Sequence, residues 1–363
     1  MPINPKSLLA PKYPFKNLVF QGGGVKSYVY HGALRVLEEY EILPQIERVG
    51  GTSAGALQAA MLCFRLSAEE TIEIYKTVDY ANIRSHRVVA EQAHTGNRLL
   101  NVGLDMARGN LDMASRIIRK YGLYSIAYMQ DWLHETIALY CRGNGRATFA
   151  DFQALGFREL YTTAVNLNRH QAEIFSADTT PDVAVADAII LSAAIPFFFE
   201  AIQFDGRTLG QGDFYIDGGA LSNYPLTVFD DPKFKKSSRY FTYGVNWETL
   251  GCQLFPSDDY SQQKTEINTI IQYAENLIET LTAVQNVAVD LRTVDRWRSI
   301  RISDCGVSMI DFEIQPNDLD PKYVEMVQTG TQAAREYLEN YHLPTDRFAD
   351  LKERLTDLFE IWH

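Results

Sequence analysis

The sequence predicts an α/β fold, because short apolar runs alternate along the chain with glycine-rich turns and helical patterns. An apolar run at 17–20 leads through three glycines into a helical pattern from about 28 to 40. A second candidate strand at 46–49 leads through a turn of small residues into an apolar helix at 56–66. A β-branched, apolar run at 159–167 is expected to form a central strand. With 363 residues, the chain is long enough for one large α/β domain or two modest ones.

The composition is that of an acidic globular protein. Its 34 Lys and Arg residues against 46 Asp and Glu residues give a net charge of −12, which argues against a nucleic-acid binder and offers no general attraction to anionic lipid. The four cysteines are far apart and form no CxxC pair, so we expect neither a zinc site nor a disulfide framework, and a reducing compartment suits them.

The chain shows no targeting or membrane-spanning pattern. Residues 1–16 carry four prolines and are expected to form an extended lead-in without the apolar core of a secretory signal. No run reaches the roughly 18 apolar residues that a membrane span needs. We therefore expect a cytoplasmic protein that can also attach peripherally to membranes, and export of the chain as an effector is a separate, open alternative.

The segment Gly51-Thr52-Ser53-Ala54-Gly55 has the Gly-x-Ser-x-Gly pattern of a nucleophile elbow. A serine in so sharp a turn takes strained backbone angles, and the two glycines remove side chains that would collide with it. The hydroxyl would then lie at the start of a helix, where the helix dipole favours negative charge. The alternative is a turn of small residues that packs a helix against a strand.

The glycines at 22–24 lie between a candidate strand and a helix, which is a suitable backbone for holding an anion. The spacing does not supply the P-loop pattern, and Ser27 occupies the place of the last glycine in a dinucleotide fingerprint. Because Ser53 follows 27 residues after Lys26, the oxyanion of an acyl-transfer reaction is favoured over a nucleotide phosphate or a pyrophosphate. Lys26 would orient the loop, meet a phosphate head group, or simply be solvated.

Taken in order, Gly-Gly-Gly-x-Lys at 22–26, Gly-x-Ser-x-Gly at 51–55 and Asp-Gly-Gly at 217–219 make the chain resemble a patatin-like phospholipase. The segment at 191–199 is also similar to the family's pattern, and the resemblance covers about residues 17–230. Ser27 departs from it, because many members have glycine there.

The resemblance implies a three-layer α/β/α fold with a mostly parallel central sheet and a helical insertion at about 82–146. Residues 17–230 would form the catalytic core, and residues 231–363 would complete the same domain. The insertion would either pack as ordinary helices or cover an acyl-chain site as a lid, which a protein or small-molecule activator could open.

The resemblance also implies a Ser-Asp dyad, in which Asp217 takes the proton of the Ser53 hydroxyl. The amides of Gly22, Gly23 and Gly24 would bind the oxyanion. The supporting residues would be Lys26, Gly51, Gly55, Gly218 and Gly219. A Ser-Asp-His triad would instead need His342 or His363. No metal or cofactor is expected, because the sequence has no calcium loop of the DxDxDG type and no Cys/His cluster.

The expected function is that of a lipid acyl hydrolase, which cleaves phospholipids or lysophospholipids during transient contact with a membrane surface. Two alternatives use the same dyad: an acyl transferase, and an esterase of neutral lipids or other esters. A third alternative, from a different class, is a nucleotide-binding protein that uses the glycine loop.

Other elements are expected from periodicity and turn signals. Helices are expected at 68–79, 126–140, 182–194, 266–294, 323–338 and 345–362. Strands are expected at 171–176, 214–217, 240–246 and 305–314, with an Asp-Gly hairpin at 204–209. The three phenylalanines at 197–199 would line an acyl pocket or lie in the core. The amphipathic helix at 266–294 would pack on the core or lie on a membrane surface.

Overall fold

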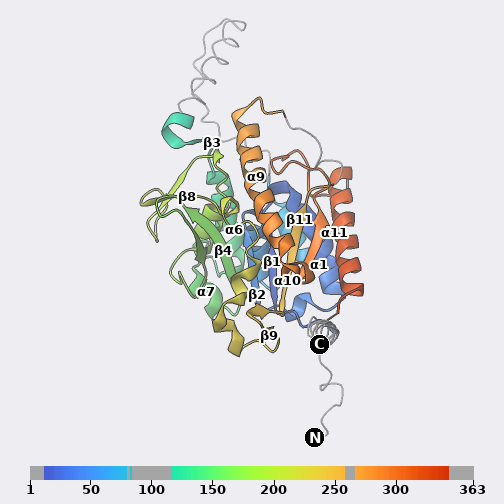
Figure 1. Ribbon diagram of the computed structural model, residues 1–363. Coiled ribbons are helices and arrows are strands. Elements are labelled where there is room, and N and C mark those ends of the chain that lie inside the picture. The colour runs from blue at the N-terminus through green and yellow to red at the C-terminus, as the bar shows by residue number, and fades with distance from the viewer. Residues whose placement is uncertain (1–11, 80–81, 84–115, 258–265, 343–363) are drawn as a thin grey trace, which may run out of the picture.

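A mostly parallel sheet forms the centre of the fold in the computed structural model, which describes residues 12–79, 82–83, 116–257 and 266–342 (Figure 1). Its strands lie in the order β12, β11, β1, β2, β4, β8, β7. Their bounds are Ser299–Ser303, Thr249–Phe255, Asn17–Phe20, Arg48–Thr52, Glu159–Asn166, Asp213–Asp217 and Ile202–Phe204. The first five run parallel, β8 and β7 are antiparallel to their neighbours, and β5 (Gln171–Phe175) pairs antiparallel with β4.

The helices surround this sheet. Their bounds are α1 Val29–Glu39, α2 Ala54–Cys63, α3 Ala68–Lys76, α6 Ala127–Tyr140, α7 Phe149–Ala154, α8 Val185–Ser192, α9 Ile270–Leu291, α10 Thr293–Trp297 and α11 Pro321–Glu339. Strand β1 is buried at every position, as expected for a parallel strand covered on both faces. The α/β/α arrangement around a mostly parallel sheet is therefore confirmed.

Two small two-stranded sheets lie outside the central one. Strand β3 (Gly122–Tyr124), within the predicted insertion, pairs parallel with β6 (Phe197–Phe199), in the segment after α8. Strands β9 (Phe241–Thr242) and β10 (Val245–Asn246) form an antiparallel pair. None of the helices in the described part of the chain combines the length and apolar character needed to cross a bilayer.

Most of the predicted elements are present within a few residues of their expected bounds. Helix α3 begins with a capping box, in which Ser67 and Glu70 exchange hydrogen bonds. Of the predicted insertion, residues 84–115 lie outside the described residues. The predicted helix at 345–362 lies outside them as well.

Two strand predictions are wrong. The run at 240–246 is a tight hairpin, because Tyr243 and Gly244 both take positive φ and turn the chain. The run at 305–314 contains no strand, since it begins with positive φ at Cys305 and Gly306 and continues through turns. Its apolar side chains are buried from those turns rather than from one face of a strand.

The sequence patterns also missed strand β11. Gly251 and Gln253 interrupt its apolar run, although both lie inside the sheet. Gly251 is needed there because a Cβ atom would lie 1.7 Å from the Tyr224 hydroxyl oxygen.

Helices α1 and α11, from opposite ends of the described chain, pack directly on one another (Figure 1). The close approach depends on glycine in both helices. A Cβ atom on Gly32 would lie 1.9 Å from the Val327 carbonyl oxygen, and one on Gly330 would lie 1.8 Å from the Val29 carbonyl oxygen.

The substitution Gly32→Ala is therefore expected to lower the free energy of unfolding by about 1–3 kcal/mol through overpacking. Helix propensity alone predicts the opposite sign, a stabilisation of about 1 kcal/mol. The midpoint of urea unfolding, followed by circular dichroism, distinguishes the two. Gln332→Ala, on the exposed face of α11, is the control and should change stability by less than about 0.5 kcal/mol. An unchanged or raised midpoint for Gly32→Ala would contradict this account of the helix contact.

Candidate active site

The sheet register brings the two distant motifs together. On one edge of β4, Thr163 pairs with Thr52, the last residue of β2, and the next residue, Ala164, pairs with Asp217, the last residue of β8. The other edge of β4 is occupied by β5 over the same residues. Strands β2 and β8 therefore follow one another along a single edge of β4. Ser53, directly after β2, consequently meets Asp217.

Ser53 has the geometry of a nucleophile elbow. Its backbone angles are φ 55° and ψ −127°, a conformation that non-glycine residues rarely adopt. Its Oγ donates a hydrogen bond of 2.6 Å to Asp217 Oδ2. Its own amide donates to the Ser192 hydroxyl at 2.9 Å, at the end of α8. The side chain lies at the N-terminus of α2, as the motif predicts.

The glycines of the motifs lie where backbone segments touch. A Cβ atom on Gly51 would lie 2.2 Å from the Gly55 carbonyl oxygen, and one on Gly55 would lie 2.4 Å from the Phe20 carbonyl oxygen. A Cβ atom on Gly218 would lie 2.3 Å from the Thr163 carbonyl oxygen. These glycines therefore allow the elbow, β1 and the Asp217 loop to pack within contact distance.

Asp217 is 2% exposed, and both of its carboxylate oxygens accept hydrogen bonds. Oδ2 accepts from Ser53, and Oδ1 accepts from the Gly219 amide at 2.7 Å. Burial raises the pKa of Asp217 to about 6, because it disfavours the charged form, while the two hydrogen bonds act in the opposite direction. The group therefore titrates near neutral pH.

Among the described residues, no histidine hydrogen-bonds to the Ser53 or Asp217 side chain to form a triad. His342 makes no hydrogen bond to Ser53 or Asp217, and His363 lies outside the described residues. His31 is buried and contacts the Tyr323 hydroxyl through Nδ1, and burial lowers its pKa to about 3. Within the described chain, no group of three or more His, Cys, Asp or Glu residues is placed to hold a metal ion.

The glycine loop offers fewer amides than its sequence suggests. The Gly22 amide donates to the Asn223 carbonyl oxygen at 3.0 Å, so it already has an acceptor in this structure, and its role at an oxyanion stays a prediction. The amides of Gly23 and Gly24 have no acceptor among the described residues. The same holds for the amide of Ala54, the first residue of α2, which directly follows the nucleophile.

Lys26 lines a cavity of about 270 Å³ together with Gly22 and Gly23, where two carboxylates neutralise it. Its Nζ is 2.7 Å from Glu279 Oε1 and 3.1 Å from Asp304 Oδ2, and the lysine is buried. Of the predicted roles, orienting the loop fits this placement, because both carboxylates hold the ammonium group away from a bound phosphate.

Three residues that the motifs did not indicate complete the site. Gln285, on α9, accepts from the Asn223 amide at 2.7 Å and donates to the Gly219 carbonyl oxygen at 2.9 Å. Asn223 Nδ2 donates to the Gly22 carbonyl oxygen at 3.1 Å. Asn223 therefore ties the Asp217 loop to the glycine loop, Gln285 ties it to α9, and Ser192 ties the elbow to α8. Ser192 lies in the 191–199 segment that resembles the family's pattern, whereas no local pattern marks Asn223 or Gln285, since their partners lie far away in the chain.

A narrow, apolar cavity of about 80 Å³ begins at Ser53, Ala54 and Gly24. It is lined beyond them mainly by aliphatic and aromatic side chains, among them Leu57, Met129, Leu133, Ile189, Ile195 and Phe199. Only Phe199 of the three consecutive phenylalanines lines this cavity; Phe198 is buried in the core, and Phe197 faces a different cavity.

The chain is similar to a known protein family, to viral proteins and to a solved structure. A family model described as "Patatin-like phospholipase" matches residues 18–230. An uncharacterized protein of Acanthamoeba polyphaga mimivirus is 24% identical over 301 residues, which cover 82% of this chain and 86% of that protein. A protein of invertebrate iridescent virus 6 named "Probable lipid hydrolase 463L" is 28% identical over 243 residues, covering 65% of this chain and 71% of the relative. Among solved structures, VipD from Legionella pneumophila superposes with a TM-score of 0.53 at 16% identity, over 92% of this chain and 68% of VipD.

Proposed function

This chain belongs to the patatin-like phospholipase family, and on that premise we propose that it is a lipid acyl hydrolase that cleaves the fatty-acyl ester bonds of phospholipids or lysophospholipids. The observation that carries the proposal is the 2.6 Å hydrogen bond from Ser53 Oγ to Asp217 Oδ2, at the mouth of an apolar cavity. The viral relative named as a lipid hydrolase supports the same chemistry.

In the proposed first step, Ser53 Oγ attacks the carbonyl carbon of the ester while Asp217 accepts the hydroxyl proton. A serine hydroxyl is a weak nucleophile until a base within hydrogen-bond reach takes its proton. The amides of Gly23, Gly24 and Ala54 are the candidate donors to the tetrahedral oxyanion, and one such donor is typically worth about 3 kcal/mol. The fatty-acyl chain would lie in the cavity that begins at Ser53.

In the second step, protonated Asp217 returns its proton to the departing alcohol oxygen, and the acyl group remains on Ser53. A water molecule then attacks the acyl-enzyme, with Asp217 as the base, and releases the fatty acid. A pKa of about 6 suits both roles, because the carboxyl group can accept and return a proton near neutral pH.

The alternative of nucleotide binding by the glycine loop has less support. Lys26, the cation of the glycine-loop motif, is already neutralised by Glu279 and Asp304. The cavity next to Gly24 is apolar, which suits a hydrocarbon chain better than a phosphate. Transient contact with a membrane surface and control by an activator stay predictions.

The substitutions Ser53→Ala and Asp217→Asn are each expected to lower kcat/KM for a chromogenic fatty-acyl ester by about 10³-fold or more, because each removes one half of the dyad. Initial rates with purified, folded variants measure this. Asp205→Asn is the matched control, since Asp205 also precedes a glycine but lies exposed in a hairpin turn, and it should keep full activity. Retention of most activity by Asp217→Asn would contradict the assignment of the base.

The pH dependence of kcat/KM should show a single acidic limb with an apparent pKa of about 6, the value to which burial raises Asp217. Because the base acts in its ionised form, activity should fall about tenfold for each pH unit below the limb and stay level above it. Stopped-assay rates across the range measure the profile. His342→Gln and His363→Gln should leave the limb in place, and its loss in either variant would instead indicate a catalytic histidine.

A further inference from the structure

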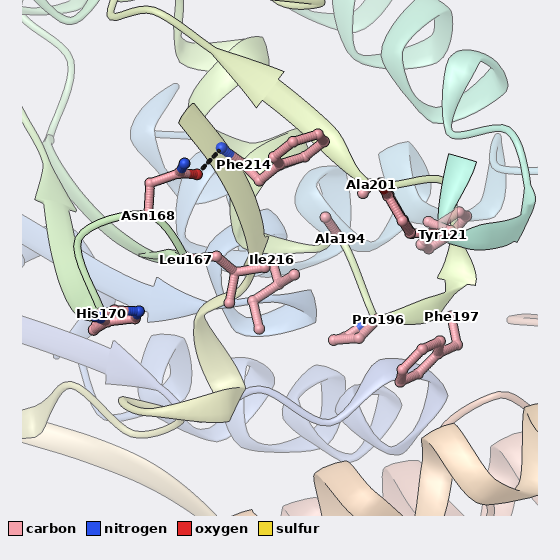
Figure 2. Close-up of a pocket in the computed structure, with 11 residues that line it drawn as sticks. Tyr121, Leu167, Asn168, His170, Ala194, Pro196, Phe197, Ala201, Phe214 and Ile216 are labelled. Carbon is pink, nitrogen blue, oxygen red and sulfur yellow. Dashed lines mark hydrogen bonds between the residues drawn. The ribbon is translucent and has the colours of Figure 1, made fainter. Parts of the chain in front are cut away.

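A second, larger cavity lies beside the one that begins at Ser53 and has no part in the proposed mechanism. Its volume is about 630 Å³, which falls within the range of about 300–1,000 Å³ typical of small-molecule sites. Figure 2 shows side chains from separate parts of the chain around it: Tyr121, the turn after β4 with Leu167, the segment 194–201, and β8 with Phe214 and Ile216.

One segment of chain separates the two cavities. Ala193 and Ile195 line the Ser53 cavity, whereas Ala194 and Pro196 line the larger one. Phe199, at the end of this segment, borders both. The two spaces are therefore separated by the thickness of a single backbone segment.

The larger cavity is also close to the proposed dyad. Ile216, which lines it, immediately precedes Asp217 in strand β8. The Asp217 amide donates at 2.8 Å to the carbonyl oxygen of Ala194, another lining residue. A ligand whose reacting group lies at Ser53 could thus extend a second part into this space.

The side chains that line the larger cavity indicate which kind of ligand it can bind. No Asp, Glu, Lys or Arg occurs among the described residues that line the cavity, and its polar side chains are confined to Tyr121, Asn168 and His170. Asn168, one of its few polar side chains, already accepts a hydrogen bond from the Phe214 amide through Oδ1 (Figure 2). The remaining wall is predominantly aliphatic and aromatic, which suits a hydrocarbon chain.

Two features of the side chains that line the larger cavity indicate that it binds a ligand. Leu167 is 42% exposed and Tyr121 is 55% exposed, so an apolar ligand would cover large apolar side chains that now contact water. Phe197, in the segment that separates the two cavities, has φ 64°, a left-handed conformation that non-glycine residues rarely adopt. Strain of this kind is usually retained where it positions a functional side chain, and here it directs Phe197 to the larger cavity.

We propose that the larger cavity binds the second hydrocarbon chain of a two-chain lipid while the chain to be cleaved lies in the cavity that begins at Ser53. This inference rests on the proposed function and narrows its substrate class to diacyl lipids in preference to single-chain lysolipids. The head group would lie outside both cavities.

Leu167→Glu places a charge in the larger cavity, and Ala201→Trp fills it; neither residue belongs to the dyad or to the oxyanion loop. Each variant is assayed with a diacyl phosphatidylcholine and with the lysophosphatidylcholine of the same chain length. Both substitutions should lower kcat/KM for the diacyl lipid about tenfold or more, equivalent to the lost burial of about two methylene groups. Activity on the lysolipid should stay within about twofold of wild type. Leu319→Glu, at a leucine that is 92% exposed and lines neither cavity, is the matched control.

An unchanged diacyl rate, or an equal loss for both lipids in a folded variant, would overturn the proposal. Circular dichroism establishes folding, and Ala201→Trp carries the test if the glutamate variant does not fold. Binding of short-chain dialkyl and monoalkyl ether phosphatidylcholines to the wild type and the variants gives a readout that does not depend on hydrolysis. If the wild type cleaves no ester, the proposed function fails, and weaker binding of the dialkyl ether alone would still support the second-chain site.

Discussion

The hydrogen bond between Ser53 and Asp217 depends on two strands, β2 and β8, sharing one edge of β4. Strand β4 pairs with β2 along its first half and with β8 beyond it, so the ends of β2 and β8 face each other across a single step in register. A slip of one residue in either pairing would turn the side chains concerned to the opposite face of the sheet. The site is therefore a consequence of sheet register, and β5 on the opposite edge of β4 helps to hold that register.

Burial sets the pKa of Asp217 in the Ser53–Asp217 pair. An exposed aspartate titrates near 4 and would be a poor base at neutral pH. At Asp217, desolvation opposes ionisation and two hydrogen bonds support it, which leaves the carboxyl group able to exchange a proton near pH 6. The same closed surroundings keep the adjoining cavity apolar, so one packing arrangement serves both the proposed chemistry and the proposed substrate. Helix α9 reinforces it through Gln285, whose side-chain amide bonds to Gly219 and Asn223 and so holds the loop after Asp217.

The sequence allowed prediction of those parts of the site that have a local signature. Gly51 and Gly55 mark the elbow, and the Asp-Gly-Gly segment marks the second loop, because close backbone contacts there exclude any side chain. Asn223 and Gln285 carry no such signature, since they are 62 residues apart and meet only in the folded chain. The hydrogen bond from the Gly22 amide to the Asn223 carbonyl oxygen could not be predicted either, because it also forms only in the folded chain.

The strand predictions failed where the apolar pattern of the sequence and the backbone conformation disagree. The run at 305–314 alternates like a strand, but turns that start with positive φ at Cys305 bury its side chains. Strand β11 was missed because Gly251 breaks its apolar run to make room for the Tyr224 hydroxyl, a contact set by tertiary packing.

The pKa of the Asp217 carboxyl group tests the central claim most directly, measured by infrared difference spectroscopy with Asp217→Asn to assign the band. In the wild type the band should titrate at about pH 6. Because the Ser53 hydroxyl stabilises the ionised form, its removal in Ser53→Ala should raise the pKa of Asp217 further. The same pKa in both proteins, or a wild-type value near 4 as in exposed aspartates, would contradict the direct contact between the two side chains.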